Sequence, residues 1–182
     1  EKHIIIKLKS GYNVGIRVDP TTQIEKVGVG VKPTFTPPPI PKQKLGLPKV
    51  AIVSTGGTIA SRVDYRTGGV RPALTASDLY SVVPELSEIA IVDTEILFSL
   101  YSENITAKHW TETAKNVAKH IEKGAAGVVV AHGTDTLGYT AAALSFALQD
   151  LPAPVIMVAS QRSADRPSSD AATNLIGAVK AA

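Results

Sequence analysis

The chain has 182 residues, 44% of them hydrophobic, and its 19 Lys and Arg against 16 Asp and Glu give a formal net charge of +3. This length is enough for one full domain core and a small additional module. The basic residues are spread along the sequence, so the charge permits contact with nucleic acid without requiring it. The absence of cysteine excludes disulfides and thiolate metal sites and fits a cytoplasmic protein. No apolar run approaches the roughly 18 residues of a membrane span, so we expect no membrane association.

Residues 1–31 predict a small β module, because "HIIIKLKSG", "YNVGIRVD" and "IEKVGVGV" alternate apolar and polar residues as strands do. A module of this size is too short to hold a core of its own. Residues 32–48 are rich in proline, which favours extended polyproline geometry. They predict a semi-rigid linker, and the alternative is a ligand for a proline-recognising module.

From residue 49 onward, strand and helix patterns alternate. "TASDLYSVV" begins a helix with a capping-box-like pair, Thr75 and Asp78, and the second strand divides at Asp93 and Thr94. The expected strands cover residues 49–54, 89–100, 127–132 and 154–160, and further helices follow the second, third and fourth strands. This order predicts an α/β fold over residues 49–182, with a doubly wound parallel sheet and helices on both faces.

Polar loops follow each expected strand, at the edge where ligands bind in such sheets. The loops contain, in chain order, Thr55-Gly56-Gly57-Thr58, Ser102-Glu103-Asn104, His132-Gly133-Thr134-Asp135-Thr136, and residues 160–166. Each loop taken alone fits a glycine turn with helix-capping residues. Their convergence on one sheet edge predicts a functional site there.

Phosphate binding is the first chemistry to consider for "TGGT", but the sequence has neither G-x-x-x-x-G-K-[ST] nor G-x-G-x-x-G opening a helix. A metal site is not predicted either, because the four histidines show no ligand spacing. We expect His109 and His120 on a surface helix, and His132 as a structural histidine at a strand end. The sequence therefore indicates neither a metal nor a cofactor in this chain.

A threonine nucleophile fits the loops better. A hydroxyl needs a base or a relay to become nucleophilic, and a glycine turn brings backbone N–H groups near the developing oxyanion. Tyr65, in the loop after "TIAS", is a candidate phenolic relay, and Thr134 with Asp135 forms a second hydroxyl–carboxylate pair.

Five segments, "TGGTIAS", "DYRTGGV", "YSENIT", "VVVAHGTDTLGYTA" and "PVIMVASQRSADRPSSDAATNL", resemble in this order the signature segments of the L-asparaginase family over residues 49–182. The resemblance implies that Thr58 attacks a side-chain amide, with Tyr65 assisting. Thr134 and Asp135 match a second triad whose third member is a lysine. The substrate-binding residues that it implies are Gly57, Ser102, Glu103 and Asp135, where Ser102 holds the α-carboxylate, Asp135 holds the α-amino group, and Glu103 replaces the glutamine usual in free asparaginases.

Within that family, the β module, the proline linker, "SRVDYRTGGVRPALTA" and "QRSADRPSSDAATNL" resemble the archaeal D subunits of glutamyl-tRNA(Gln) amidotransferases. This resemblance implies a glutaminase that supplies ammonia, and an E subunit that uses ATP and Mg²⁺ to convert Glu-tRNA(Gln) to Gln-tRNA(Gln). It also implies a homodimer within a heterotetramer. Asparagine is the alternative amide donor. The alternative functions are a free-standing cytoplasmic L-asparaginase and a non-catalytic interaction module with the same fold.

The family's second-triad lysine has no match at this sheet edge, since Lys180 lies in the fourth expected helix. The chain starts at Glu1 and stops at Ala182 within a helical pattern. We therefore expect a C-terminally incomplete fragment whose continuation carries the lysine. On this view Leu175, Ile176 and Val179 are left exposed.

Overall fold

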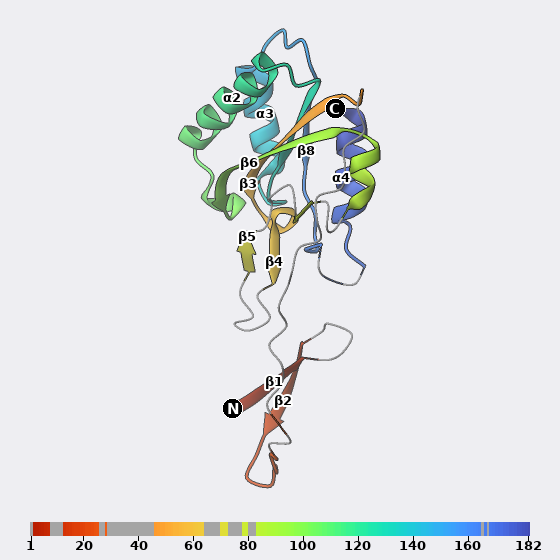
Figure 1. Cartoon of the computed structure of the whole chain (residues 1–182). Coiled ribbons are helices and arrows are strands. Elements are labelled where there is room, and N and C mark those ends of the chain that lie inside the picture. Colours follow the sequence, from red (N-terminus) through yellow and green to blue (C-terminus); the bar gives the residue numbers. More distant parts are fainter. Residues whose placement is uncertain are drawn as a thin grey trace. The chain divides into compact units, whose positions relative to one another are not determined.

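A computed structural model of the chain describes residues 2–7, 13–25, 28, 46–63, 70–72, 78–79, 83–164, 166 and 168–182. The chain divides into two compact units, Glu1–Phe35 and Thr36–Ala182, and each is described by itself (Figure 1). Most of the predicted proline linker and the predicted helix start at Thr75 lie outside the described residues, whereas Asp78 and Leu79 are helical.

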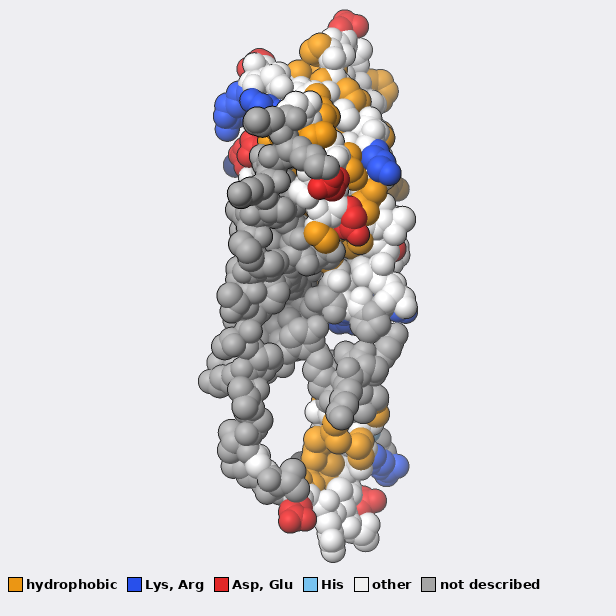
Figure 2. All heavy atoms as spheres, turned by 45° about the vertical axis from the view of Figure 1, so that its right-hand side comes forward, with side chains coloured by type: hydrophobic (Ala, Val, Ile, Leu, Met, Phe, Trp, Pro, Cys, Tyr) orange, Lys and Arg blue, Asp and Glu red, His pale blue; other side chains and the backbone are white. Residues whose placement is uncertain are grey.

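The first unit contains an antiparallel hairpin of β1 (Lys2–Lys7) and β2 (Asn13–Val18). Its register places two cross-strand pairs on one face, Ile4 opposite Ile16 and Ile6 opposite Val14, and these four side chains are 38–45% exposed. Hydrophobic side chains of the hairpin are visible on its surface in Figure 2. The expected third strand is absent at its described residues, 24, 25 and 28, and its remaining residues lie outside the described ones.

The second unit has the predicted alternation of strands and helices, with additional short elements in the first crossover. In chain order the elements are β3 (Lys49–Gly56), the 3-10 helix η1 (Thr58–Ala60), β4 (Ser61–Val63), β5 (Val70–Pro72), the 3-10 helix η2 (Pro84–Glu88), β6 (Ile91–Leu100), the 3-10 helix η3 (Ser102–Asn104), α2 (Ala107–Glu122), β7 (Gly127–Ala131), α3 (Leu137–Ala147), β8 (Val155–Val158) and α4 (Ala171–Ala181).

The four long strands form one parallel sheet in the order β6-β3-β7-β8, which confirms the predicted doubly wound α/β fold. The division expected in the second strand is wrong: β6 is continuous, because Asp93 and Thr94 both pair with β3. The irregularity lies later, where the β3–β6 register shifts between Ser54 and Gly56. This shift comes at the start of the first polar loop.

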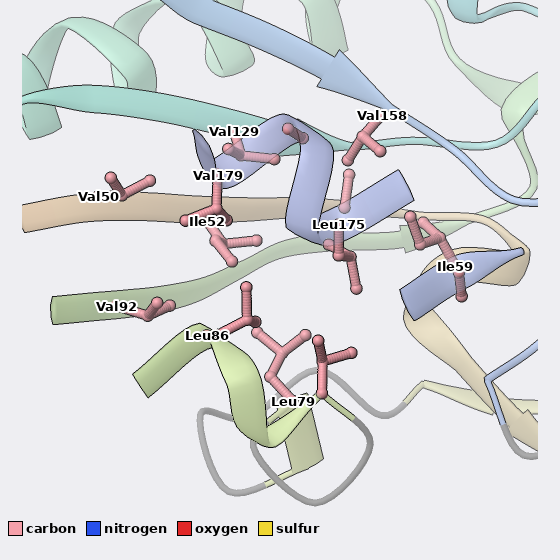
Figure 3. Packing of buried hydrophobic residues seen from close by; sticks show 14 of the residues in the cluster. Val50, Ile52, Ile59, Leu79, Leu86, Val92, Val129, Val158, Leu175 and Val179 are labelled. Atoms are coloured by element: carbon pink, nitrogen blue, oxygen red, sulfur yellow. The ribbon is translucent and has the colours of Figure 1, made fainter. Parts of the chain in front are cut away.

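Alternate residues of β3 enter the two hydrophobic cores of the unit. Val50 and Ile52 face a cluster with Leu86 of η2 and Leu175 of α4 (Figure 3). Ala51 and Val53 face the other side of the sheet, where Val117 of α2 covers them. A strand buried on both faces is expected to be a continuous apolar run, and β3 is one.

The expected exposure of the last helix is wrong. Leu175 and Val179 are 1% and 3% exposed, and Ile176 packs against the same cluster. The physical reason is that the apolar face of α4 packs against the sheet, next to Val129 and Val158 (Figure 3).

Candidate active site

A cavity of about 450 Å³ lies beyond the carboxyl ends of the strands. The chain passes from β3 to β6 on one side and later to β7 on the other, so the crevice where ligands bind in open α/β sheets is at these strand ends. All four predicted loops line it, with Thr58, Ser102, Thr134 and Ser163 among the lining residues. The convergence expected from the sequence is therefore confirmed.

Gly57 has a backbone conformation and a packing that require glycine. Its φ of 79° and ψ of 177° lie in a region that is essentially restricted to glycine. A Cβ atom at Gly57 would lie 2.5 Å from the backbone of Gly133, in the third loop. The N–H of Gly57 donates to the Leu100 carbonyl at 3.2 Å. Gly57 thus contributes close packing between loops, and its own donor is already paired.

The hydroxyls of the first loop have different roles. The Thr55 hydroxyl is buried and donates to the Ala131 carbonyl at 3.0 Å, which ties β3 to β7. The Ser54 oxygen accepts the N–H of Gly56 at 3.3 Å. Thr58 begins η1 and lines the cavity, and within the part of the chain that the structure describes its hydroxyl has no hydrogen bond. Thr58 therefore carries the hydroxyl that is available to a bound molecule.

Ser102 and Glu103 of η3 line the cavity from the end of β6. Ser102 is 4% exposed, and its hydroxyl has no hydrogen-bond partner among the described residues. Because a buried unpaired hydroxyl costs about 1–3 kcal/mol, it is suited to bind a polar ligand group. Thr136 donates to the Ser102 carbonyl at 2.7 Å and so links the second loop to the third.

The third loop presents Thr134 and Asp135, both exposed, to the cavity. His132 before them is 1% exposed and bonds through its ring nitrogens to Gly133 and Thr140. Burial holds the pKa of His132 below its ordinary value, so the ring is neutral at pH 7. His132 is thus neutral and buried, and both of its ring nitrogens are hydrogen-bonded, which fits the structural role predicted for it.

The fourth loop is held by Asp170, a residue that the sequence patterns did not single out. Its carboxylate accepts the N–H groups of Gln161 and Arg162 at 3.0–3.1 Å. These backbone bonds, that of Gln161 first, hold the pKa of Asp170 below its ordinary value. The sequence signal that could have indicated this residue is the Ser-Ser-Asp run before a helix, which is typical of helix-capping residues.

Ser163 is a second residue that sequence reasoning missed. It is 4% exposed and lines the cavity, and its hydroxyl has no hydrogen-bond partner among the described residues. No motif in the sequence separates it from the other serines of this loop.

His120 lies on the buried side of α2 and is 5% exposed. Its Nε2 lies 2.9 Å from Glu95 Oε2, and the Asn116 amide donates to Oε1 of the same carboxylate at 2.8 Å. Burial alone would raise the pKa of Glu95. The hydrogen bonds from Asn116 and His120 outweigh it and hold this pKa below its ordinary value. The helix pattern could not show this, because Glu95 lies on β6. His109 is half-buried and caps α2 by accepting the Thr106 N–H.

Metal-ligand clusters of three or more His, Cys, Asp or Glu do not occur among the described residues. No described helix is long and apolar enough to cross a membrane. On the face shown in Figure 2, the coloured Lys and Arg side chains stand apart from one another among acidic and hydrophobic ones. The described cavity lining contains no lysine, and Tyr65 lies outside the described residues.

Comparison with known proteins places this geometry in a family. The family model "Asparaginase, N-terminal" matches residues 49–182, and the model "GatD N-terminal domain" matches residues 1–27. The L-asparaginase from Thermococcus kodakarensis has a similar structure, with a TM-score of 0.66 and 35% identity, over 72% of this chain and 39% of that one.

Two similar proteins are each named as the D subunit of a glutamyl-tRNA(Gln) amidotransferase. The one from Pyrococcus abyssi is 52% identical over 98% of this chain and 41% of its own length. The one from Methanococcus maripaludis is 52% identical over 100% of this chain and 44% of its own length. The chain thus spans less than half the length of these relatives. Because the family model for asparaginases matches residues 49–182, most of its length, the chain belongs to the asparaginase family.

Proposed function

We propose that the protein containing this chain hydrolyses the side-chain amide of glutamine, with Thr58 as nucleophile, and supplies ammonia to a tRNA-dependent amidotransferase. The observation that carries the proposal is the Thr58 hydroxyl, which is unbonded within the described residues and borders the same cavity as Ser102, Thr134 and Asp135. Membership of the asparaginase family supports amide chemistry. The names of the relatives support the amidotransferase context.

In the proposed reaction, the Thr58 oxygen forms a bond to the amide carbon as its proton passes to a base. The carbon–nitrogen bond then breaks, and the leaving nitrogen takes a proton and departs as ammonia. Water hydrolyses the resulting ester, which releases glutamate and restores the hydroxyl. Tyr65 would assist the attack, and Thr134 with Asp135 would form the second proton-transfer pair with a lysine.

Substrate binding is proposed to use both ends of the amino acid. The Ser102 hydroxyl, buried without a partner among the described residues, would bind the α-carboxylate. The exposed Asp135 carboxylate, which lines the cavity, would bind the α-ammonium through its opposite charge. Gly57 would bring the nucleophile loop close to the third loop, and Glu103 would contact the side-chain end.

The proposed partners follow from the relatives' names and from the match of residues 1–27. An E subunit would use ATP and Mg²⁺ to activate Glu-tRNA(Gln), with no cofactor held by this chain. The assembly would be a heterotetramer, built on a homodimer of the protein containing this chain and working in the cytoplasm. We also propose a β module at 1–31, a linker at 32–48 and the amidohydrolase domain from residue 49 onward.

A free-standing L-asparaginase is the second candidate, supported by the similarity to the Thermococcus kodakarensis structure. The N-terminal match favours the amidotransferase, because a free-standing hydrolase has no need of a docking module. Ammonia release from glutamine and from asparagine, measured with and without the partner subunit and Glu-tRNA(Gln), distinguishes the two. Glutamine hydrolysis that rises with partner and tRNA supports the amidotransferase, and partner-independent asparagine hydrolysis supports the alternative.

The nucleophile is tested by Thr58→Val in the full-length protein, because valine keeps the shape and removes the hydroxyl. We expect ammonia release to fall by roughly 10³-fold or more, as it does when covalent nucleophiles are removed. Thr111→Val, which removes an exposed hydroxyl of α2, is the matched control and should leave the rate unchanged. A folded Thr58→Val protein with near-normal turnover would transfer the nucleophilic role to Thr134.

A further inference from the structure

Gly133 is the residue at which three of the four cavity loops meet. A Cβ atom on Gly57 would lie 2.5 Å from both the Cα and the N of Gly133, so the two backbones are in direct contact. On its other side, a Cβ on Gly133 would lie 2.7 Å from Ser102 Cβ and 2.8 Å from Ser102 Oγ. Because there is no free space on either side, a displacement of Gly133 moves both the turn before Thr58 and Ser102.

A buried chain of hydrogen bonds ends on this residue. Trp110 Nε1 donates to Thr140 Oγ1 at 2.9 Å, Thr140 Oγ1 lies 2.9 Å from His132 Nε2, and His132 Nδ1 lies 2.8 Å from the Gly133 carbonyl oxygen. Thr140 and His132 are each 1% exposed. The chain therefore starts at the partly buried Trp110 on α2, passes through the buried Thr140 of α3 and reaches the buried His132 at the end of β7.

The chemistry of each group sets the direction of this chain. An indole N–H only donates and a carbonyl only accepts, so the Thr140 oxygen accepts from Trp110 and the Gly133 carbonyl accepts from His132. His132 Nδ1 must then carry the proton, which leaves Nε2 of the neutral ring to accept the Thr140 hydroxyl. Every donor has one acceptor, and bonds aligned in this way strengthen one another.

We propose that the Trp110–Thr140–His132 chain positions Gly133, and through it the Thr58 turn and Ser102, for the amide hydrolysis proposed above. The three residues hold the Gly133 carbonyl in one orientation, and the planarity of the peptide bond passes that orientation to Thr134. They act as positioning residues, since His132 and Thr140 are buried away from the cavity and are not among the residues that line it.

Thr140→Val in the full-length protein with its partner tests the proposal, because valine keeps the shape of threonine but breaks the chain at its centre. We expect kcat for glutamine to fall about 100-fold, the loss typical of a displacement of about 1 Å in catalytic groups. Thr140→Ser, which keeps the hydroxyl, should restore kcat to within about threefold of wild type.

Thr113→Val is the matched control. Thr113 is also a buried helical threonine, 2% exposed, but its hydroxyl donates only to the His109 carbonyl of its own helix. Both valine variants should lower the melting temperature, whereas only Thr140→Val should lower kcat. Equal kcat values for the two, in protein shown to be folded, would overturn the positioning role while leaving the proposed function intact. A wild-type protein with no amidase activity would overturn the proposed function and the positioning role together.

A second measurement tests the hydrogen-bond chain independently of enzyme activity, by NMR of the His132 ring. In full-length protein labelled with ¹⁵N-histidine, the His132 ring should show its proton on Nδ1, and its pKa should lie below the ordinary histidine value because the ring is buried. The signal is assigned as the histidine shifted by Thr140→Val and unshifted by Thr113→Val. A proton on Nε2, or titration near the ordinary histidine value of about 6.5, would overturn the chain as described.

Discussion

Replacing Gly57 by alanine would test the packing at the centre of the cavity. The substitution places a methyl group 2.5 Å from the Gly133 backbone and 2.8 Å from the His132 carbonyl carbon, where neither neighbour is a movable side-chain end. Overpacking of this kind costs about 1–3 kcal/mol. The backbone conformation, with φ 79° and ψ 177°, costs a non-glycine residue about 1–3 kcal/mol more. We therefore expect the free energy of unfolding to fall by about 2–6 kcal/mol.

The assay is urea unfolding of the full-length protein, with the midpoint and slope compared between wild type and variant. Gly177→Ala is the control: Gly177 lies within α4 and an added Cβ would meet nothing within 4 Å, so alanine should stabilise by about 0.5–1 kcal/mol. Turnover should also fall in Gly57→Ala, since Thr58 follows directly. A destabilisation below about 1 kcal/mol with unchanged turnover would show that the two loops are not packed as described.

Two further predictions concern the fourth loop. Asp170→Asn removes the charge that accepts the Gln161 and Arg162 N–H groups. Because the pKa of Asp170 is lowered in the folded state, its contribution is present above the unfolded value of about 3.9 and is lost as the pH falls through the folded value. Melting temperatures should thus differ between wild type and variant at pH 7 and converge below about pH 4; a constant difference would contradict the charge-based reason. Ser163→Ala should raise the unfolding free energy by about 1–3 kcal/mol, because it removes a buried hydroxyl that has no hydrogen-bond partner among the described residues. If Ser163 bonds the substrate, KM for glutamine should rise about tenfold, the equivalent of one hydrogen bond of about 1.4 kcal/mol; an unchanged KM would remove it from the binding residues.

Local pattern determined the kind and order of the elements. The alternation of strand and helix patterns from residue 49 onward predicted the parallel α/β fold, and β3 and β7 are strands of that fold with buried apolar residues. The polar loops then had to meet at one edge, because parallel strands place their carboxyl ends together. The fold class and the place of the site followed from periodicity and chain order alone.

Only the tertiary structure decided which side chains are free to act. Thr55 and Thr58 have the same chemistry and nearly the same neighbours in sequence, yet Thr55 is bonded to Ala131, 76 residues away, and Thr58 has no such bond among the described residues. His120 is buried and lies within hydrogen-bonding distance of Glu95 on β6, a partner that the sequence of α2 does not reveal. A side chain's availability depends on partners from distant parts of the chain, and the burial that brings them together is not encoded in the spacing of any single segment.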